Sequence, residues 1–353
     1  MPNGILEAVF SKFLSSHVVS EKIEFLWHAG EPLTVGLDYF RNATRLCEQY
    51  NHNGIEIQHT VQTNGVLITQ EWCDFFNEHN YCVGVSIDGP QHIHDYNRKT
   101  WGGKGSFKNV MRGFELLEKN GINAGVLSVL SANSLENPAS IYDFFISIGA
   151  KWLAFNVEEV EGSNIHASTY NPESSVISNH YRTFMRYFFR RWSAEGKPFK
   201  IREFDDILAI LQSVIAKNDY FRRPDETKPM SIVTIQKNGD VSTFSPEFAG
   251  AVSEKYSNFI IGNIISDSIS EIANNNNLLA ITNEIQRGIV NCAKTCKWFT
   301  FCGGGYISNK FYENGDVTST ETTACKLHRM ALSEMLMGEL TSLSKEKASN
   351  PAF

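Results

Sequence analysis

Residues 292–305 read Cys292-Ala-Lys-Thr-Cys296-Lys-Trp-Phe-Thr-Phe-Cys302-Gly-Gly-Gly305, and a polar stretch containing glycine leads from there to Cys325. Four of the seven cysteines thus lie within about a tenth of the chain. Three neighbouring thiolates and a distant fourth can surround one tetrahedral zinc ion or one [4Fe–4S] cube. We therefore predict a metal site here rather than dispersed core cysteines, and the spacing alone leaves zinc and iron–sulfur both open.

The composition excludes several classes of protein. A chain of 353 residues can bury a large core, and its net charge of −7 argues against nucleic-acid binding as the main function. No apolar run is long enough to cross a bilayer, and Met1-Pro-Asn-Gly4 lacks the basic and apolar start of a signal peptide. The odd cysteine count favours a reducing cytoplasm over a disulfide framework. We expect neither a nucleic acid nor a membrane as a partner.

The first half of the chain alternates between two hydrophobic periods. Strand-like segments cover residues 22–27, 55–61, 81–87, 124–130 and 152–157. Helical segments cover residues 5–14, 38–50, 71–79, 106–119 and 137–148. This alternation predicts a parallel sheet with right-handed crossovers, either an open doubly wound sheet or a (β/α) barrel. The isolated Cys47, Cys73 and Cys82 lie in apolar surroundings and are predicted to be buried packing residues.

Polar or glycine-rich residues follow nearly every predicted strand. They are His28 to Glu31, Thr63 to Gly65, Asp88-Gly89 and Glu158-Glu159. In barrels, the carboxyl ends of the strands form the active-site face. We therefore expect a site at these strand ends.

The second half of the chain changes character. Helices are predicted over residues 174–192 and 204–216 without an intervening strand. The first of them carries the basic run Arg186 to Arg191, which is interpreted as a solvated helical face rather than a binding patch. A hairpin follows, with an Asn-Gly turn between residues 230–235 and 241–244. Residues 259–264 are apolar, residues 266–286 are helical in period, and a closing helix over 327–344 precedes a frayed tail.

Three strand-end motifs carry a family resemblance. His28-Ala-Gly-Glu-Pro32, Gln62-Thr-Asn-Gly65 and Ser86-Ile-Asp-Gly-Pro90, in this order before the cysteine cluster, resemble radical S-adenosylmethionine (SAM) enzymes with a SPASM or twitch domain. These include anaerobic sulfatase-maturing enzymes and peptide maturases, and the chain looks most like cyclophane-forming maturases of the GrrM/OscB type. The likeness covers about Phe25 to Cys325.

The resemblance implies a fold, a domain division and a set of cosubstrate contacts. The fold is a partial (β/α) TIM-type barrel lacking its first strand, with a cysteine-rich SPASM/twitch-like domain. The division is barrel 1–200, bridging helical segment 201–228, auxiliary-cluster domain 229–330, and C-terminal helix and tail 331–353. The residues implied to contact SAM are His28, Ala29, Gly30, Glu31, Asn64, Ser86, Arg98 and Glu159. On the sequence alone, His28 could instead be held by a local hydrogen bond, and Arg98 could simply be exposed.

The second cluster of the SPASM pattern is not supported by the sequence. Tyr306 stands where the family often has a cysteine, and no cysteine lies near Phe244-Ser-Pro-Glu247. The four remaining cysteines would complete one [4Fe–4S] auxiliary cluster without an open iron, which suits electron relay or structure better than substrate coordination. The family's acidic proton acceptor is displaced as well, so Glu247 is a catalytic candidate, although a solvated glutamate is the simpler interpretation.

A further departure concerns the cluster that starts radical chemistry. By resemblance it needs C-x3-C-x2-C on the loop after the first strand, and this sequence contains no such motif. We therefore expect the first strand and its loop to be missing and the chain as written to be inactive, as a shortened form or as a non-catalytic remnant. A SAM-cleaving [4Fe–4S] cluster is expected only if an upstream segment exists.

Three functions remain for comparison. The leading one is C–H abstraction and C–C crosslinking of a short ribosomal precursor peptide, with a reductant such as flavodoxin or ferredoxin. The second is non-catalytic binding of that peptide, and the third is a zinc-stapled α/β protein. The sequence does not indicate the crosslinked residues or the oligomeric state.

Overall fold

A computed structural model describes residues 1–353 except 17, 20, 163, 171–174, 217–221 and 350–353. Six strands form one sheet in chain order, β1 to β6, and three more form a small second sheet, β7 to β9. The pairs β1–β2, β2–β3, β3–β4 and β5–β6 are parallel. The predicted α/β fold with a parallel sheet is therefore confirmed, whereas closure into a partial barrel stays a prediction.

The chain divides into two compact units, each built from two separate segments. The first unit comprises Met1–Ser128 and Pro229–Thr282, and the second comprises Val129–Lys228 and Asn283–Phe353. The division into four consecutive parts that the resemblance implied is a different kind of division, and it stays a prediction.

The first unit contains most of the sheet and the strand ends. Its strands are β1 (Lys22–Trp27), β2 (Glu56–Thr63), β3 (Cys82–Ser86), β4 (Gly125–Leu130, which runs on into the second unit), β7 (Val233–Ile235), β8 (Asp240–Thr243) and β9 (Gly262–Asn263). Its helices are α1 (Asn3–Leu14), α2 (Leu37–Tyr50), α3 (Gln70–Glu78), α4 (Gln91–Asn97), α5 (Phe107–Lys119) and α10 (Ile269–Ala273), with short 3-10 turns at Pro32–Val35, Pro246–Phe248 and Ser257–Phe259.

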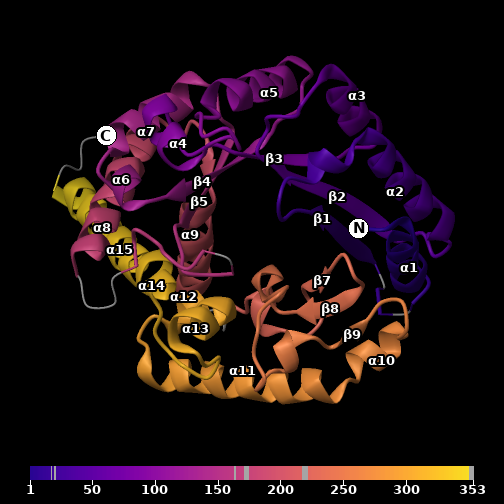
Figure 1. The fold of residues 1–353 in the computed structure, drawn as a ribbon. Helices are drawn as coiled ribbons and strands as arrows, with labels where there is room; N and C mark the ends of the chain where they lie inside the picture. The colour runs from indigo at the N-terminus through magenta and orange to yellow at the C-terminus, as the bar shows by residue number, and fades with distance from the viewer. Residues whose placement is uncertain (17, 20, 163, 171–174, 217–221, 350–353) are drawn as a thin grey trace. The chain divides into compact units, whose positions relative to one another are not determined.

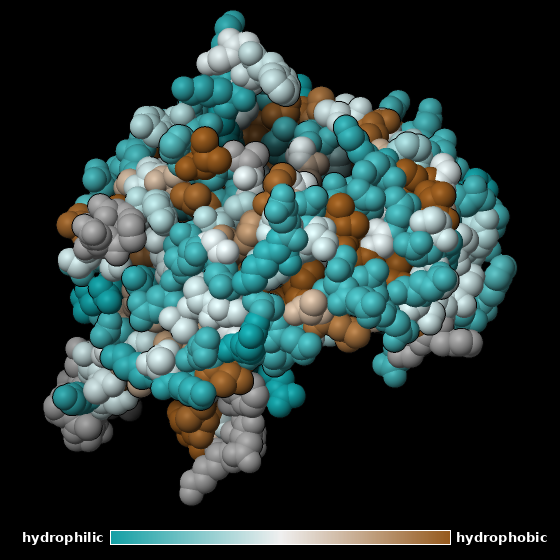
Figure 2. Space-filling model, turned by 60° about the horizontal axis from the view of Figure 1, so that its bottom comes forward, coloured by the Kyte–Doolittle hydropathy of each residue, from teal (hydrophilic) through white to brown (hydrophobic). Residues whose placement is uncertain are grey.

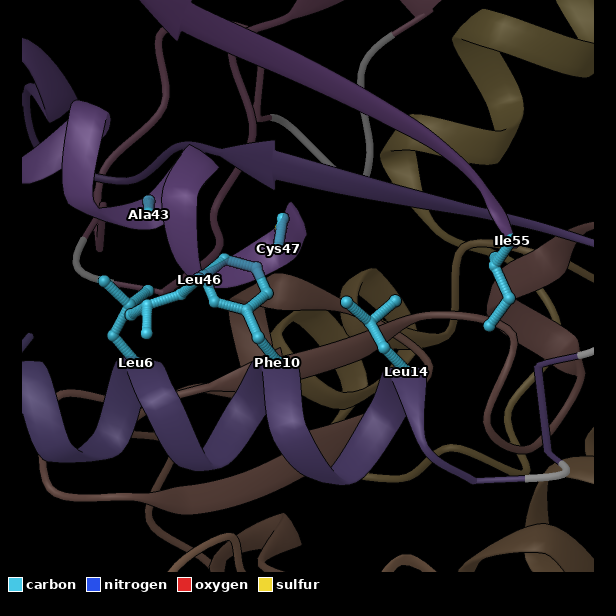
Figure 3. Packing of buried hydrophobic residues seen from close by; sticks show 7 residues of the cluster. All are labelled: Leu6, Phe10, Leu14, Ala43, Leu46, Cys47 and Ile55. Carbon is cyan, nitrogen blue, oxygen red and sulfur yellow. The ribbon is translucent and has the colours of Figure 1, made fainter. Parts of the chain in front are cut away.

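Helices cover one face of the strands β1 to β3 (Figure 1). Apolar residues recur along α1 at every fourth position, and they pack against α2 in a cluster shown in Figure 3. The cluster consists of Leu6, Phe10, Leu14, Ala43, Leu46, Cys47 and Ile55. Phe25 of β1 meets Phe10 edge-on, with ring centroids 4.9 Å apart. The predicted burial of Cys47 and Cys73 is confirmed.

The other face of β1 stays open. Lys22, Glu24 and Leu26 are exposed, although parallel sheets are usually covered on both faces. Cys82 of β3 is also exposed, so its predicted burial was wrong. The reason is strand alternation: Val83 and Val85 are buried, which turns Cys82 to the opposite face.

The second unit is mostly helical. Its strands are β5 (Trp152–Val157) and β6 (Lys200–Ile201). Its helices are α6 (Ala132–Leu135), α7 (Pro138–Ser147), α8 (Ser175–Ala194), α9 (Arg202–Ile215), α11 (Asn276–Thr295, which begins in the first unit), α12 (Phe299–Cys302), α13 (Ile307–Asn314), α14 (Thr323–Cys325), a π-helical turn (Lys326–Ala331) and α15 (Leu332–Ser349), with a 3-10 turn at Asp225–Thr227. The prediction that no strand separates the two middle helices was wrong, because the two-residue strand β6 is too short to show a period.

The basic run of α8 forms ion pairs within this unit. Glu339 of α15 is 8% exposed and accepts hydrogen bonds from Arg186 (3.0 Å) and Arg190 (2.7 Å). Arg191 pairs with Asp143 and Glu195. These ion pairs therefore hold α15 against α8. The sequence had suggested either a solvated helical face or a binding patch for this run, and neither includes this role.

The surface carries scattered apolar side chains. Figure 2 shows one face on which hydrophobic residues lie in separate groups among hydrophilic ones. Trp101, Ile215 and Val252 are among the most exposed. Within the described ranges, no helix has both the length and the apolar character that crossing a bilayer requires.

Candidate functional site

Glu31 ties together the ends of β1 and β2 in the first unit. Its Oε1 accepts hydrogen bonds from Thr63 Oγ1 (2.7 Å) and the Leu33 backbone N–H (3.1 Å), and its Oε2 accepts one from the Asn64 N–H (2.7 Å). A carboxylate that accepts three bonds satisfies two otherwise unpaired loop amides. The structure thus brings the predicted residues Glu31 and Asn64 together.

The turn before Glu31 has an unusual backbone. Ala29 and Gly30 have φ angles of 70° and 65°, both in the left-handed region. A residue with a side chain pays about 1 kcal/mol for this conformation, so it persists only where neighbouring contacts impose it. The Glu31 contacts supply that constraint. His28, at the end of β1, is exposed.

Ser86 at the end of β3 is held by a residue that the sequence analysis did not select. Gln62 of β2 donates a hydrogen bond from Nε2 to Ser86 Oγ at 3.2 Å. The missed signal was strand alternation, since Gln58, Thr60 and Gln62 are polar at every second position and so share a face.

Arg98 has a carboxylate partner inside the protein. Its Nε lies 2.7 Å from Asp88 Oδ2 and its Nη2 lies 3.0 Å from Asp88 Oδ1, and Asp88 is 1% exposed. Asp88 also donates its backbone N–H to His94 Nδ1 (3.4 Å), and His94 Nε2 contacts Ser106 Oγ (3.0 Å). Burial lowers the pKa of His94 to about 4. Arg98 is therefore not simply exposed, and its contact with a cosubstrate stays a prediction.

Glu159 follows β5 in the second unit. Asn309 Nδ2 donates to its Oε2 at 3.1 Å, and burial raises the pKa of this carboxyl. His328 Nε2 lies 3.7 Å from Glu159 Oε1, yet the same nitrogen accepts the Val157 N–H at 3.1 Å. Because burial lowers the pKa of His328 well below its usual value, this imidazole is neutral and the pair is not an ion pair. A role for Glu159 toward a cosubstrate stays a prediction.

Glu247 lies in the 3-10 turn after β8. Its backbone N–H donates to Ser245 Oγ at 3.3 Å, and its side chain is half-buried. No contact with a reacting group tests its predicted catalytic role.

The four clustered cysteines line one pocket. Cys292 comes from the end of α11, Cys302 from α12 and Cys325 from α14, with Cys296 in the connection after α11. Its other lining residues include Trp298, Phe299, Gly304, Gly305 and Arg329. Left-handed φ angles at Gly303 and Gly304 turn the chain between the third cysteine and α13.

The thiols of this pocket are suited to binding a metal only after losing their protons. Burial raises the pKa of Cys302 and raises that of Cys325 to about 12, so metal uptake would release protons. No group of three or more His, Cys, Asp or Glu in the described part of the chain is arranged to hold a single metal ion. A zinc site needs all four sulfurs about 2.3 Å from one atom, whereas in a cube each sulfur binds its own iron.

Two buried cations accompany the cysteines. Lys310 of α13 is 1% exposed, and its Nζ lies 3.4 Å from Cys292 Sγ. Arg329 is 7% exposed and lines the pocket. Buried positive charge beside a set of four sulfurs fits a site that carries negative charge when thiolates bind a metal. Neither residue was selected from sequence, where a lysine within a helical period gives no separate signal.

Tyr306 occupies the position where the resemblance placed a further cysteine. Its hydroxyl accepts a hydrogen bond from Arg329 Nε at 3.0 Å, and its backbone N–H donates to Glu226 Oε1 at 2.9 Å. Its ring is stacked on His328, with centroids 6.1 Å apart. Burial raises the pKa of Tyr306 to about 12. The residue therefore forms a neutral hydrogen-bonded link rather than a metal ligand.

Known proteins resemble this chain over most of its length. A family model described as the Radical SAM superfamily matches residues 14–145. An uncharacterized protein of Synechocystis is 37% identical over 344 residues, covering 96% of this chain and 85% of that protein. The serine-type anaerobic sulfatase-maturating enzyme of Bacteroides thetaiotaomicron is 29% identical, covering 92% of this chain and 78% of that enzyme.

A solved structure shows the same fold. Native anSMEcpe with bound AdoMet has a TM-score of 0.76 to this chain at 24% sequence identity, covering 98% of this chain and 90% of that one. The same protein has also been solved with bound AdoMet and the Kp18Cys peptide, with a TM-score of 0.72 at 23% identity, covering 98% of this chain and 91% of that one.

Proposed function

Because this chain belongs to the radical SAM superfamily, a family of oxidoreductase-type enzymes, we propose that it binds S-adenosylmethionine and modifies a ribosomally made precursor peptide. The observation that carries the proposal is the meeting of Cys292, Cys296, Cys302 and Cys325 in one pocket, although up to 33 residues separate them along the chain. Maturase relatives along nearly the whole chain, and a peptide-bound structure of the same fold, support it.

The strand ends of the first unit form the proposed cosubstrate site. By resemblance, its residues are His28, Ala29, Gly30, Glu31, Asn64, Ser86 and Arg98. The part that the resemblance implies for Glu159, a residue of the second unit, stays a separate prediction. Glu31 acts as a positioning residue, because its three hydrogen bonds fix the strained turn at Ala29 relative to Asn64. Gln62 orients the Ser86 hydroxyl in the same way.

The cysteine pocket is proposed to hold one auxiliary [4Fe–4S] cluster. Within the described residues, no group of three or more His, Cys, Asp or Glu is arranged to hold a single metal ion, which supports this cluster over zinc. The two buried cations fit the negative charge of either site. When bound, the cluster would supply an acceptor for one electron. Cys292, Cys296, Cys302 and Cys325 would hold it, and Lys310 and Arg329 would balance its charge.

The residues of this chain do not fit the separate cluster that cleaves SAM. Such a cluster requires C-x3-C-x2-C, and residues 1–353 contain no such spacing. No step of radical generation is therefore derived for this chain.

The proposed reaction is formation of a C–C crosslink, a cyclophane, in the peptide. In such a crosslink, a β-carbon would lose a hydrogen atom to a 5′-deoxyadenosyl radical and then bond to an aromatic ring of the same peptide. Forming that radical breaks a C–S bond of SAM and consumes one electron, at a cluster for which residues 1–353 contain no C-x3-C-x2-C ligands. The ring then loses a proton and an electron, so the peptide loses two hydrogens in all. Glu247 is the candidate acceptor for the proton, and a reductant such as flavodoxin or ferredoxin is the proposed electron-donating partner.

Anaerobic purification tests the proposal. We expect about four iron and four sulfide per chain, and heat of binding when SAM is titrated in. One zinc ion without iron would refute the cluster and leave a zinc-stapled protein. Absence of SAM binding would refute the cosubstrate site.

A non-catalytic peptide-binding protein is the second candidate, favoured by the lack of C-x3-C-x2-C. Incubation of the chain with SAM, dithionite and a Gly-rich precursor peptide separates the two functions. Release of 5′-deoxyadenosine with loss of two hydrogens from the peptide supports the enzyme. Peptide binding without either product supports the binder.

A further inference from the structure

Lys310 is a buried cation whose partner is a sulfur. Its Nζ donates to Cys292 Sγ at 3.4 Å and to the Gly304 carbonyl at 3.2 Å, and the residue is 1% exposed. Within the described ranges, no carboxylate lies at ion-pair distance from this ammonium. Lysine is almost never fully buried without a partner, because its desolvation is costly. The Cys292 sulfur, as a thiolate, is the anion that the geometry offers.

The second buried cation of the pocket differs. Arg329 donates from Nε to Tyr306 Oη at 3.0 Å, and its Nη2 lies 3.4 Å from Asp206 Oδ2. Asp206 compensates the guanidinium charge in part. Lys310 is therefore the cation whose charge is directed at the cysteine set without a neighbouring carboxylate.

We propose that Lys310 is a positioning residue that raises the reduction potential of the cluster bound by the four cysteines, acting through its hydrogen bond to Cys292. This inference rests on the proposed auxiliary cluster. A fully ligated [4Fe–4S] site carries net negative charge, and reduction adds one more electron. A fixed positive charge and an N–H···S bond stabilise the reduced form more than the oxidised form, so the site accepts an electron more readily.

Lys310 would give the Cys292 ligand a distinct part in electron uptake. Lys310 is held on α13 by burial, so the ammonium does not need to reorient when the charge of the site changes. Exposed lysines next to other ligands lack this effect, because water screens their charge. Lys326 follows Cys325 directly, has a 41% exposed side chain and lies 3.5 Å from Glu321 Oε2, which makes it a matched control.

The test compares Lys310→Met and Lys310→Gln with Lys326→Met in the full chain, reconstituted anaerobically with iron and sulfide. Titration with dithionite, followed by the EPR signal of the reduced cluster, gives the midpoint potential. We expect the one-electron reduction constant to fall at least tenfold in Lys310→Met, a shift of about 59 mV to lower potential. Lys310→Gln keeps an N–H donor but no charge and should fall between Lys310→Met and wild type. Lys326→Met should match wild type.

The outcomes separate this inference from the proposed function. A wild-type chain that binds no iron and sulfide defeats the proposed cluster. A cluster that forms in all variants with an unchanged potential defeats the role of Lys310 alone. Failure of both Lys310 variants to take up iron would also overturn the inference, in favour of a purely structural lysine.

Discussion

Replacing Glu31 by Gln tests the link between the strand ends, and its effect follows from hydrogen-bond geometry. The carboxylate presents acceptors to two backbone donors on opposite oxygens: the Leu33 N–H on Oε1 and the Asn64 N–H on Oε2. A glutamine amide has one acceptor oxygen and one NH2 donor. Whichever way the amide is turned, its NH2 faces one of the two backbone donors.

The expected cost is one lost charge-assisted bond and one donor left unsatisfied, about 2 kcal/mol. For a compact unit of this size, that corresponds to a fall in Tm of about 4–8 °C. Differential scanning calorimetry of Glu31→Gln measures it, and Glu48→Gln on the exposed side of α2 is the matched control, expected to lie within about 0.5 kcal/mol of wild type. The disturbed turn at Ala29 should also weaken SAM binding, measured by calorimetric titration. The affinity should fall about tenfold for each 1.4 kcal/mol of binding free energy that is lost.

A Tm for Glu31→Gln equal to that of Glu48→Gln would refute the three-bond arrangement around Glu31. A lowered Tm with unchanged SAM affinity would keep the arrangement but refute the strand ends as the cosubstrate site.

Three further predictions follow from the described contacts. Burial lowers the pKa of His59 and of His94 to about 4, so their stabilising contribution is present above pH 6.5 and is lost as the pH falls toward 4. Urea unfolding should therefore show about 2 kcal/mol less stability per histidine at pH 5 than at pH 7. A His59→Gln variant whose stability keeps the same pH dependence as wild type would contradict this. Gly113→Ala should destabilise by about 2 kcal/mol or more, because a Cβ there would lie 2.1 Å from the Gly65 backbone carbonyl, whereas the atoms nearest to a Cβ in Gly84→Ala belong to the movable Gln62 side chain, so this change should cost about 1 kcal/mol; equal melting curves would count against the packing of α5 on the strand end. Cys296→Ser should lower the metal content and the Tm, while the exposed Cys82→Ser should change neither, and metal analysis that finds no difference between them would remove Cys296 from the site.

Local periodicity allowed much of the fold to be predicted. Lys22–Trp27 and Trp152–Val157 form strands with the predicted bounds, because each is a short segment rich in aliphatic and aromatic residues that ends at polar or glycine-rich residues. The short elements β6 and α4 were missed, since two to seven residues cannot display a clear period. Whether the Cys82 side chain is buried or exposed depends on which face of the sheet the helices cover. Packing between elements decides that, and the local sequence does not show it.

The donor atoms of the site can be identified from residue order: four cysteines spaced as metal ligands, and polar residues after the strands. Spacing along the chain limits which thiolates can reach one another, so this information is local. The charges that surround the donor atoms depend instead on how distant segments fold together. Lys310 and Cys292 lie 18 residues apart, and Arg98 and Asp88 lie 10 residues apart, and each pair meets because helices and strands fold back on one another. Contacts of this kind depend on which side chains the fold brings together, and a linear pattern does not encode that.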